Sequence, residues 1–80
     1  MEMIIVVRNR IVQLVHENHI TINKLAEKSG LSPSSLKNIL YGKSNNPKLV
    51  TIKILCDGLG ITLAEFFNTK EFNELDQYIK

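Results

Sequence analysis

The spacing of apolar residues along the chain predicts helices almost throughout. Near the start, apolar side chains at positions 4, 7, 11, 14 and 15 lie on one face of a helix from about residue 4 to residue 18. The early run MIIVV is β-branched and would suit a strand, but the helical spacing continues beyond it and favours a helix. A second helix is predicted over about residues 22–29, and it faces inward through Ile22, Leu25 and Ala26.

Helix-end signals mark a sharp corner in the stretch EKSGLSPSSLKNILYGK, residues 27–43. Gly30 sits where a helix end favours a left-handed residue. Ser32 followed by Pro33 is typical of the cap and the first residue of a new helix, because the missing N–H of proline needs no partner there. The corner, residues 29–31, therefore joins two short helices, and this arrangement predicts a helix-turn-helix.

The helix after the corner has two different faces. At 100° per residue, its apolar side chains gather on one side, at Leu36, Ile39 and Leu40. Its polar side chains point the other way, and Gly42 ends the helix. The polar face consists of Ser34, Lys37, Asn38 and Tyr41.

Three further segments continue the helical pattern. Residues 48–58 predict a fourth helix, and Thr62 caps a short fifth helix that runs through Phe67. The last amphipathic stretch, which carries Phe72, Leu75 and Ile79, predicts either a sixth helix or a frayed tail. The apolar stripe of the fourth helix is expected to consist of Leu49, Ile52, Leu55, Cys56 and Leu59.

Length and composition indicate one small globular domain. The chain has 80 residues, of which 44% are hydrophobic and 22% are charged. We expect an all-α domain over residues 1–69, followed by a C-terminal extension, residues 70–80, that is a helix or a dimer arm. The single Cys56 cannot form an internal disulfide, and no apolar run approaches the ~18 residues that a membrane span needs. These features predict a cytoplasmic protein.

The charge is unevenly distributed. Residues 1–48 carry seven Lys and Arg against three acids, which gives +4, whereas residues 49–80 carry three Lys against five acids, which gives −2. A polyanion, if one is bound, is expected to meet the first half. The alternative is ordinary surface charge.

Two stretches carry a resemblance to a known family: TINKLAEKSGLSPSSLKNILYGK, and NPKLVTIKILCDGLGITLAEFF after it. They resemble the Cro/phage-repressor (XRE-like) helix-turn-helix family over roughly residues 8–68. The resemblance implies a five-helix, lambda-repressor-like fold. It also implies that the third helix, about residues 33–41, lies in the major groove of a two-fold symmetric DNA operator bound by a homodimer.

The resemblance implies that Ser34, Lys37 and Asn38 read bases. The chemistry agrees, because Asn38 can pair with adenine N6 and N7, and Lys37 can donate to guanine O6 and N7. The alternatives are that these three residues form only a solvated helix face, and that residues 43–46 form only a polar loop. Contacts to the DNA backbone are expected from Ser32, Ser35, Tyr41, Lys43, Ser44, Asn45 and Asn46.

The chain departs from the family pattern at three positions. Ile22 stands where many members have a glutamine that braces a phosphate, so that contact is not expected here. Val15 and Leu40 stand where some members have an Arg–Glu ion pair, and we expect these two side chains to pack against each other instead.

The two arginines near the start, at positions 8 and 10, are expected to be exposed to solvent rather than bound to DNA.

Other chemistry is not predicted. His16 and His19 do not form the HExxH zinc pattern, so no metal site is expected. Cys56 is expected to be a small core residue. Ser32 is assigned to a helix cap, and no nucleophile elbow accompanies it. We therefore expect no enzyme, no cofactor and no small-molecule ligand.

Two functions from different classes remain. The first is a sequence-specific, double-stranded DNA-binding transcriptional regulator, a repressor, that acts as a homodimer. The alternative is a protein-interaction module, antitoxin-like or regulatory, that uses a C-terminal apolar patch. The residues of that dimer or partner patch are Phe66, Phe67, Phe72, Leu75 and Ile79.

Overall fold

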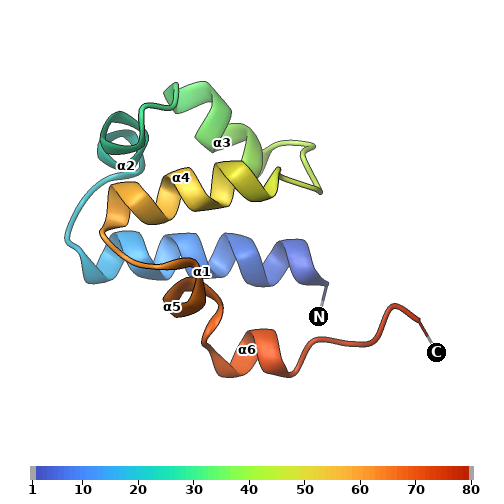
Figure 1. Ribbon diagram of the computed structural model, residues 1–80. Helices are drawn as coiled ribbons and strands as arrows, with labels where there is room; N and C mark the ends of the chain where they lie inside the picture. The colour runs from blue at the N-terminus through green and yellow to red at the C-terminus, as the bar shows by residue number, and fades with distance from the viewer. Residues whose placement is uncertain (1, 80) are drawn as a thin grey trace.

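The computed structural model describes residues 2–79, which form six helices and no strand (Figure 1). The predicted all-α, helix-turn-helix class is therefore confirmed. The MIIVV run belongs to the first helix, as the helical spacing predicted. The helices are α1 (Met3–Glu17), α2 (Ile22–Ser29), α3 (Pro33–Tyr41), α4 (Leu49–Leu59), α5 (Leu63–Phe67) and α6 (Lys70–Asn73).

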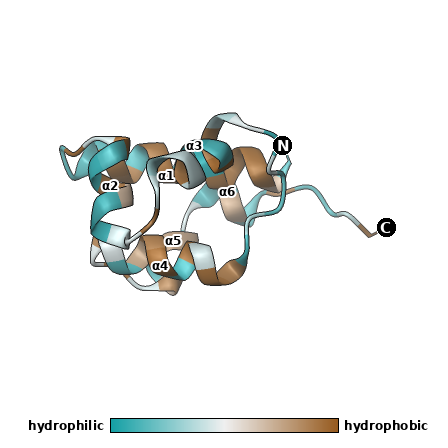
Figure 2. Cartoon of the chain, turned by 90° about the horizontal axis from the view of Figure 1, so that it is seen from above, coloured by the Kyte–Doolittle hydropathy of each residue, from teal (hydrophilic) through white to brown (hydrophobic). Residues whose placement is uncertain are grey.

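The helices are stacked around α1 and α4. In Figure 1, α2 and α3 lie above α4, whereas α5 and α6 lie below α1. The most extensive contacts between helices are those of α2 with α4. Seen from above, α2 carries much more hydrophilic colour than α4 (Figure 2), which agrees with an outer position for α2. The chain beyond α6 extends away from the helices in both views.

The core is built from one face of each of the helices α1 to α5. Burial confirms most of the predicted stripe of α4, but the prediction for Leu49 is wrong, because its side chain is 67% exposed. Leu49 is the first residue of α4, and Val50 beside it is equally exposed, so this end of the helix lies at the edge of the core. Cys56 is fully buried, and burial raises the pKa of its thiol. The largest fully buried side chains are Phe66, Ile11, Leu25, Leu36, Leu55 and Cys56.

The three phenylalanines pack against one another. The ring centroids of Phe66 and Phe67 are 4.9 Å apart, and those of Phe67 and Phe72 are also 4.9 Å apart, both in edge-to-face arrangements. Phe66 has no exposed surface, so its assignment to a surface patch is wrong. Phe67 and Phe72 are half-buried and pack against the core. Of the predicted patch, Ile79 alone is highly exposed, at 88%.

The C-terminal extension contains one helical turn and then an extended chain. Thr69 caps α6 by accepting a hydrogen bond from the backbone N–H of Phe72. Beyond α6, the Tyr78 hydroxyl accepts a hydrogen bond of 3.2 Å from the backbone N–H of Met3. Phe72 and Tyr78 therefore connect the extension to the rest of the domain. The division of the chain at residue 69 stays a prediction.

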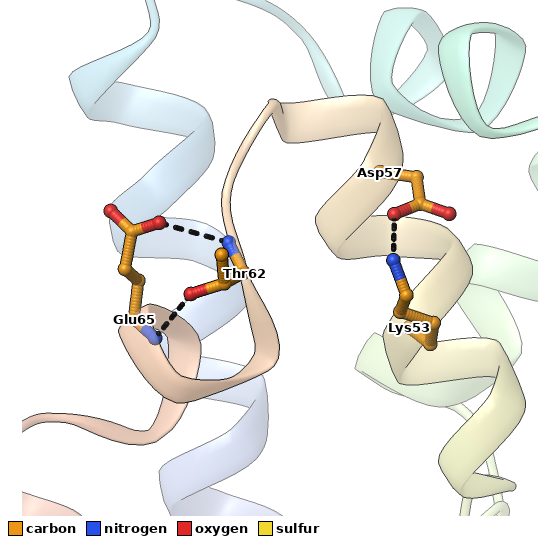
Figure 3. Close-up of polar contacts among 4 residues, drawn as sticks. All are labelled: Lys53, Asp57, Thr62 and Glu65. Atoms are coloured by element: carbon orange, nitrogen blue, oxygen red, sulfur yellow. Dashed lines mark hydrogen bonds and ion pairs between the residues drawn. The ribbon is translucent and has the colours of Figure 1, made fainter.

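Local hydrogen bonds define the short helix α5. The Thr62 hydroxyl accepts from the backbone N–H of Glu65 at 3.0 Å, and the Glu65 carboxylate accepts from the backbone N–H of Thr62 at 3.0 Å (Figure 3). This capping box confirms the predicted start of α5 and satisfies two N–H groups of a helix that has only five residues. Figure 3 also shows the exposed ion pair between Lys53 and Asp57 on α4.

The helices α2 and α4 approach each other closely at Ser29 and Gly58. A Cβ atom on Gly58 would lie 2.2 Å from Ser29 Oγ and 3.3 Å from Ser29 Cα. We expect Gly58→Ala to lower the free energy of unfolding by about 1–3 kcal/mol, because the two helices would have to move apart. Denaturant unfolding measures this change.

Ser29 provides the matched control. Its buried hydroxyl has no hydrogen-bond partner among the described residues. Ser29→Ala is therefore expected to be neutral or stabilising. In the double variant, Ser29→Ala should recover part of the loss caused by Gly58→Ala, because the nearest clashing atom is gone. Strictly additive effects in that double-mutant cycle would contradict the proposed contact.

Candidate nucleic-acid interface

The corner between α2 and α3 is held by backbone hydrogen bonds. The N–H of Leu31 donates to the carbonyl of Ala26 at 2.9 Å, and the N–H of Gly30 donates to the carbonyl of Glu27 at 3.2 Å. Gly30 has a φ of 68°, a left-handed conformation that glycine adopts without a steric penalty. The turn consists of residues 30–32, one residue later than predicted, because Ser29 remains in α2.

The start of α3 is capped as the sequence predicted. Ser32 Oγ accepts a hydrogen bond of 3.1 Å from the backbone N–H of Ser35. The hydroxyls of Ser32 and Ser35 also lie 2.8 Å apart, so one hydroxyl proton bridges the pair. The other hydroxyl proton remains for an external acceptor such as a phosphate oxygen. Together, these two serines can therefore donate one hydroxyl hydrogen bond to the DNA backbone, rather than two.

The predicted base-reading residues lie together on the exposed face of α3. Ser34, Lys37 and Asn38 are all exposed, and Tyr41 is 70% exposed at the end of the same helix. The opposite face of α3 is buried, as the apolar spacing predicted. Neither Lys37 nor Lys43 forms an ion pair with another described residue, so both ammonium groups are free to bind an anion.

The side chain and the carbonyl of Asn38 lie close to Gly42, the glycine that ends α3. A Cβ atom on Gly42 would lie 2.2 Å from Asn38 Oδ1 and 2.8 Å from the Asn38 carbonyl oxygen. The N–H of Gly42 donates to that same carbonyl at 3.0 Å. The absence of a side chain at position 42 thus leaves space for the Asn38 carboxamide. The sequence indicated Gly42 as a helix end but not as a neighbour of a candidate base reader.

The loop between α3 and α4 presents polar groups next to this face. Lys43, Asn45 and Asn46 are exposed, whereas Ser44 is half-buried. Asn45 and Asn46 also help to line a mainly apolar groove of about 580 Å³, which runs between the start of α1 and the start of α4. The loop therefore lies between the exposed face of α3 and this groove.

Arg8 reaches from α1 to the end of α3, so the expectation that it is exposed is wrong. Its Nε donates to the carbonyl of Ile39 at 2.7 Å. Its Nη2 donates to the carbonyl of Gly42 at 3.3 Å and to the carbonyl of Ser44 at 3.1 Å. The guanidinium therefore joins the last turn of α3 to the loop that follows. This contact of Arg8 was not predicted from the sequence.

Arg10 makes a similar contact on the other side of the domain, and its predicted exposure is also wrong. Its Nε donates to the carbonyl of Phe66 and its Nη2 to the carbonyl of Glu65, both at 2.8 Å. These bonds satisfy carbonyls near the end of α5, where a positive charge is favourable. Arg10 thus stabilises α5 rather than the α3 region.

At the positions that depart from the family pattern, the structure places apolar side chains in or against the core. Ile22 is half-buried and packs against the core instead of facing a phosphate. Val15 and Leu40 are buried in the same core cluster. Their direct contact stays a prediction.

The two histidines considered as metal ligands do not belong to a cluster of ligating side chains among the described residues. His16 and His19 are exposed. Within residues 2–79 there is no group of three or more His, Cys, Asp or Glu side chains that could hold a metal ion. Over the same residues, none of the helices combines the length and the apolar character needed to cross a membrane.

Comparisons with known proteins agree with this geometry. Residues 10–71 match the Cro/C1-type HTH DNA-binding domain. Among solved structures, the chain is similar to the crystal structure of the prophage Lp1 protein 11, with 30% sequence identity and a TM-score of 0.81. That likeness covers 92% of this chain and 97% of the prophage protein. A comparison with curated proteins found no match. The chain therefore belongs to the Cro/C1-type family of helix-turn-helix DNA-binding domains.

Proposed function

We propose that this protein is a transcriptional regulator that reads the major groove of double-stranded DNA with α3, as a homodimer. Membership of a DNA-binding family supports the DNA-binding part. The observation that carries the choice of site is the exposed polar face of α3, where Ser34, Lys37 and Asn38 lie opposite a fully buried face. The repressor role rests on the resemblance to phage repressors.

Recognition would divide into base reading and backbone contact. Asn38 would hydrogen-bond with adenine N6 and N7, and Lys37 would donate to guanine O6 and N7. Ser34 can donate or accept at a base edge. The exposed donors of the α3–α4 loop, with Lys43 as the cation, would hold phosphates and fix the register of α3 in the groove.

Exposed apolar side chains support a second copy as the protein partner. Leu49 and Val50 are each 67% exposed at the start of α4, and Tyr78 is 74% exposed in the C-terminal extension. A two-fold dimer would hide such side chains and would present two α3 helices to adjacent turns of the same DNA face.

A partner-binding role for the C-terminal patch has less support. Phe66 is wholly buried, and Phe67 and Phe72 pack against it and against the core. Much of the surface of these rings is therefore buried inside the domain and is not available to a partner. A DNA-reading function accounts for the polar face of α3, which the partner-binding role leaves unused.

Selection from a random duplex pool tests the proposal. The purified protein is incubated with the pool at near-physiological salt, and the bound duplexes are sequenced. We expect enrichment of a two-fold symmetric motif with half-sites about one helical turn apart. A bound pool that stays random, with binding that disappears as salt rises, would contradict sequence-specific reading.

A further inference from the structure

Arg8 links α1 to a segment that is far away in sequence, the end of α3 and the loop after it. Its three acceptors lie 31, 34 and 36 residues further along the chain. The Ile39 carbonyl belongs to the last turn of α3, and the Gly42 and Ser44 carbonyls belong to the segment that leaves it. A single half-buried side chain on α1 therefore contacts both the candidate reading helix and the candidate backbone-binding loop.

The contact fixes the loop because the guanidinium is planar and rigid. Its Nε and Nη2 donors have a fixed spacing, so the carbonyls they meet are held at fixed positions. The Gly42 carbonyl belongs to the peptide plane just before Lys43, and the Ser44 carbonyl belongs to the plane just after Ser44, so Arg8 orients the planes at the two ends of the Lys43–Ser44 pair. The backbone that carries the Lys43 side chain therefore lies between two carbonyls that Arg8 holds.

The same contact bears on Asn38. Gly42 is held by Arg8 through its carbonyl and by Asn38 through its N–H. The Asn38 carboxamide lies against Gly42 so closely that no side chain fits between them. A shift of Gly42 would therefore change the space in which the Asn38 carboxamide orients itself.

We propose that Arg8 is a positioning residue for DNA binding, which holds the α3–α4 loop and Gly42 so that Lys43 meets a phosphate while Asn38 meets a base. This inference rests on the proposed function. It assigns Arg8 no contact with DNA of its own, because the guanidinium is turned toward three carbonyl groups of the protein. A lysine cannot replace it, because one ammonium group lacks the fork of donors in a fixed plane.

The test compares Arg8→Met and Arg8→Lys with the control Arg10→Met. Arg10 makes a comparable pair of carbonyl contacts at α5, away from α3, so its loss tests stability alone. Each variant is titrated against the duplex selected by the unchanged protein, at a temperature where unfolding curves show it to be folded. Hydrogen exchange of the amides of residues 42–46 is measured on the same free proteins.

We expect Arg8→Met to weaken binding at least tenfold, to make the salt dependence less steep by about one, and to speed exchange in the loop. Arg8→Lys should restore neither the affinity nor the protection, whereas Arg10→Met should bind like the unchanged protein. Unchanged affinity in folded Arg8→Met, or full recovery with Arg8→Lys, would overturn the positioning role. Failure of the unchanged protein to select any motif would instead overturn the proposed function.

Discussion

Replacing Asn38 with alanine is expected to weaken binding to the selected operator by about 1–3 kcal/mol for each half-site, which is roughly 5- to 150-fold. The carboxamide has a separate donor and acceptor, so it can accept from adenine N6 and donate to adenine N7 at the same time. Asn38 is exposed and contributes nothing to the buried core, so the variant should fold normally. A fluorescence-anisotropy titration measures the affinity, and circular dichroism checks the fold.

The matched control for Asn38→Ala is Lys43→Ala. Lys43 is expected to contact a phosphate, so its loss should weaken all sequences alike and reduce the salt slope by about one. Asn38→Ala should instead leave the affinity for unrelated DNA unchanged and lose only the preference for the operator. Equal weakening on operator and unrelated DNA by Asn38→Ala would show that this side chain does not read a base.

Replacing Phe66 with alanine is expected to lower the free energy of unfolding by about 3–5 kcal/mol. The ring is wholly buried, and it lies next to Phe67 and Phe72. The Arg10 guanidinium also lies 6.0 Å from the centre of the Phe66 ring. Because a small domain has about 5–15 kcal/mol of stability in total, much of the protein could unfold at ambient temperature. Thermal and denaturant unfolding measure the loss.

Ile79→Ala provides the control for Phe66→Ala. Ile79 belongs to the same predicted patch, but its side chain is 88% exposed. Its loss should change the stability by no more than about 0.5 kcal/mol. If Phe66→Ala were as stable as Ile79→Ala, Phe66 would not be the core residue that its burial indicates, and a surface role for the patch would regain support.

The helix-turn-helix could be predicted from sequence because its signals are local. Gly30 supplies the left-handed end of α2, and Ser32 with Pro33 supplies the start of α3. Each signal acts within four residues of the chain, and the apolar spacing between them sets which face of α3 is buried. The exposed positions of Lys37 and Asn38 follow directly from that spacing.

The roles of Arg8 and Phe66 could not be predicted in this way, because they depend on partners far along the chain. The acceptors of Arg8 become neighbours only once α1 has packed near the end of α3. A signal was present, however. Arg8 follows Ile4 by four residues and precedes Ile11 by three, so it shares the buried stripe of α1. A cation on such a stripe requires a partner.

Base-by-base replacement with 7-deazaadenine in the selected duplex tests most directly the central claim that α3 reads the major groove. This base lacks only the N7 acceptor, which faces the major groove. At one adenine per half-site, we predict that the replacement weakens binding of the unchanged protein but not of Asn38→Ala. Equal effects on both proteins at every adenine, or no effect at any adenine, would contradict reading of an adenine by Asn38 in the major groove.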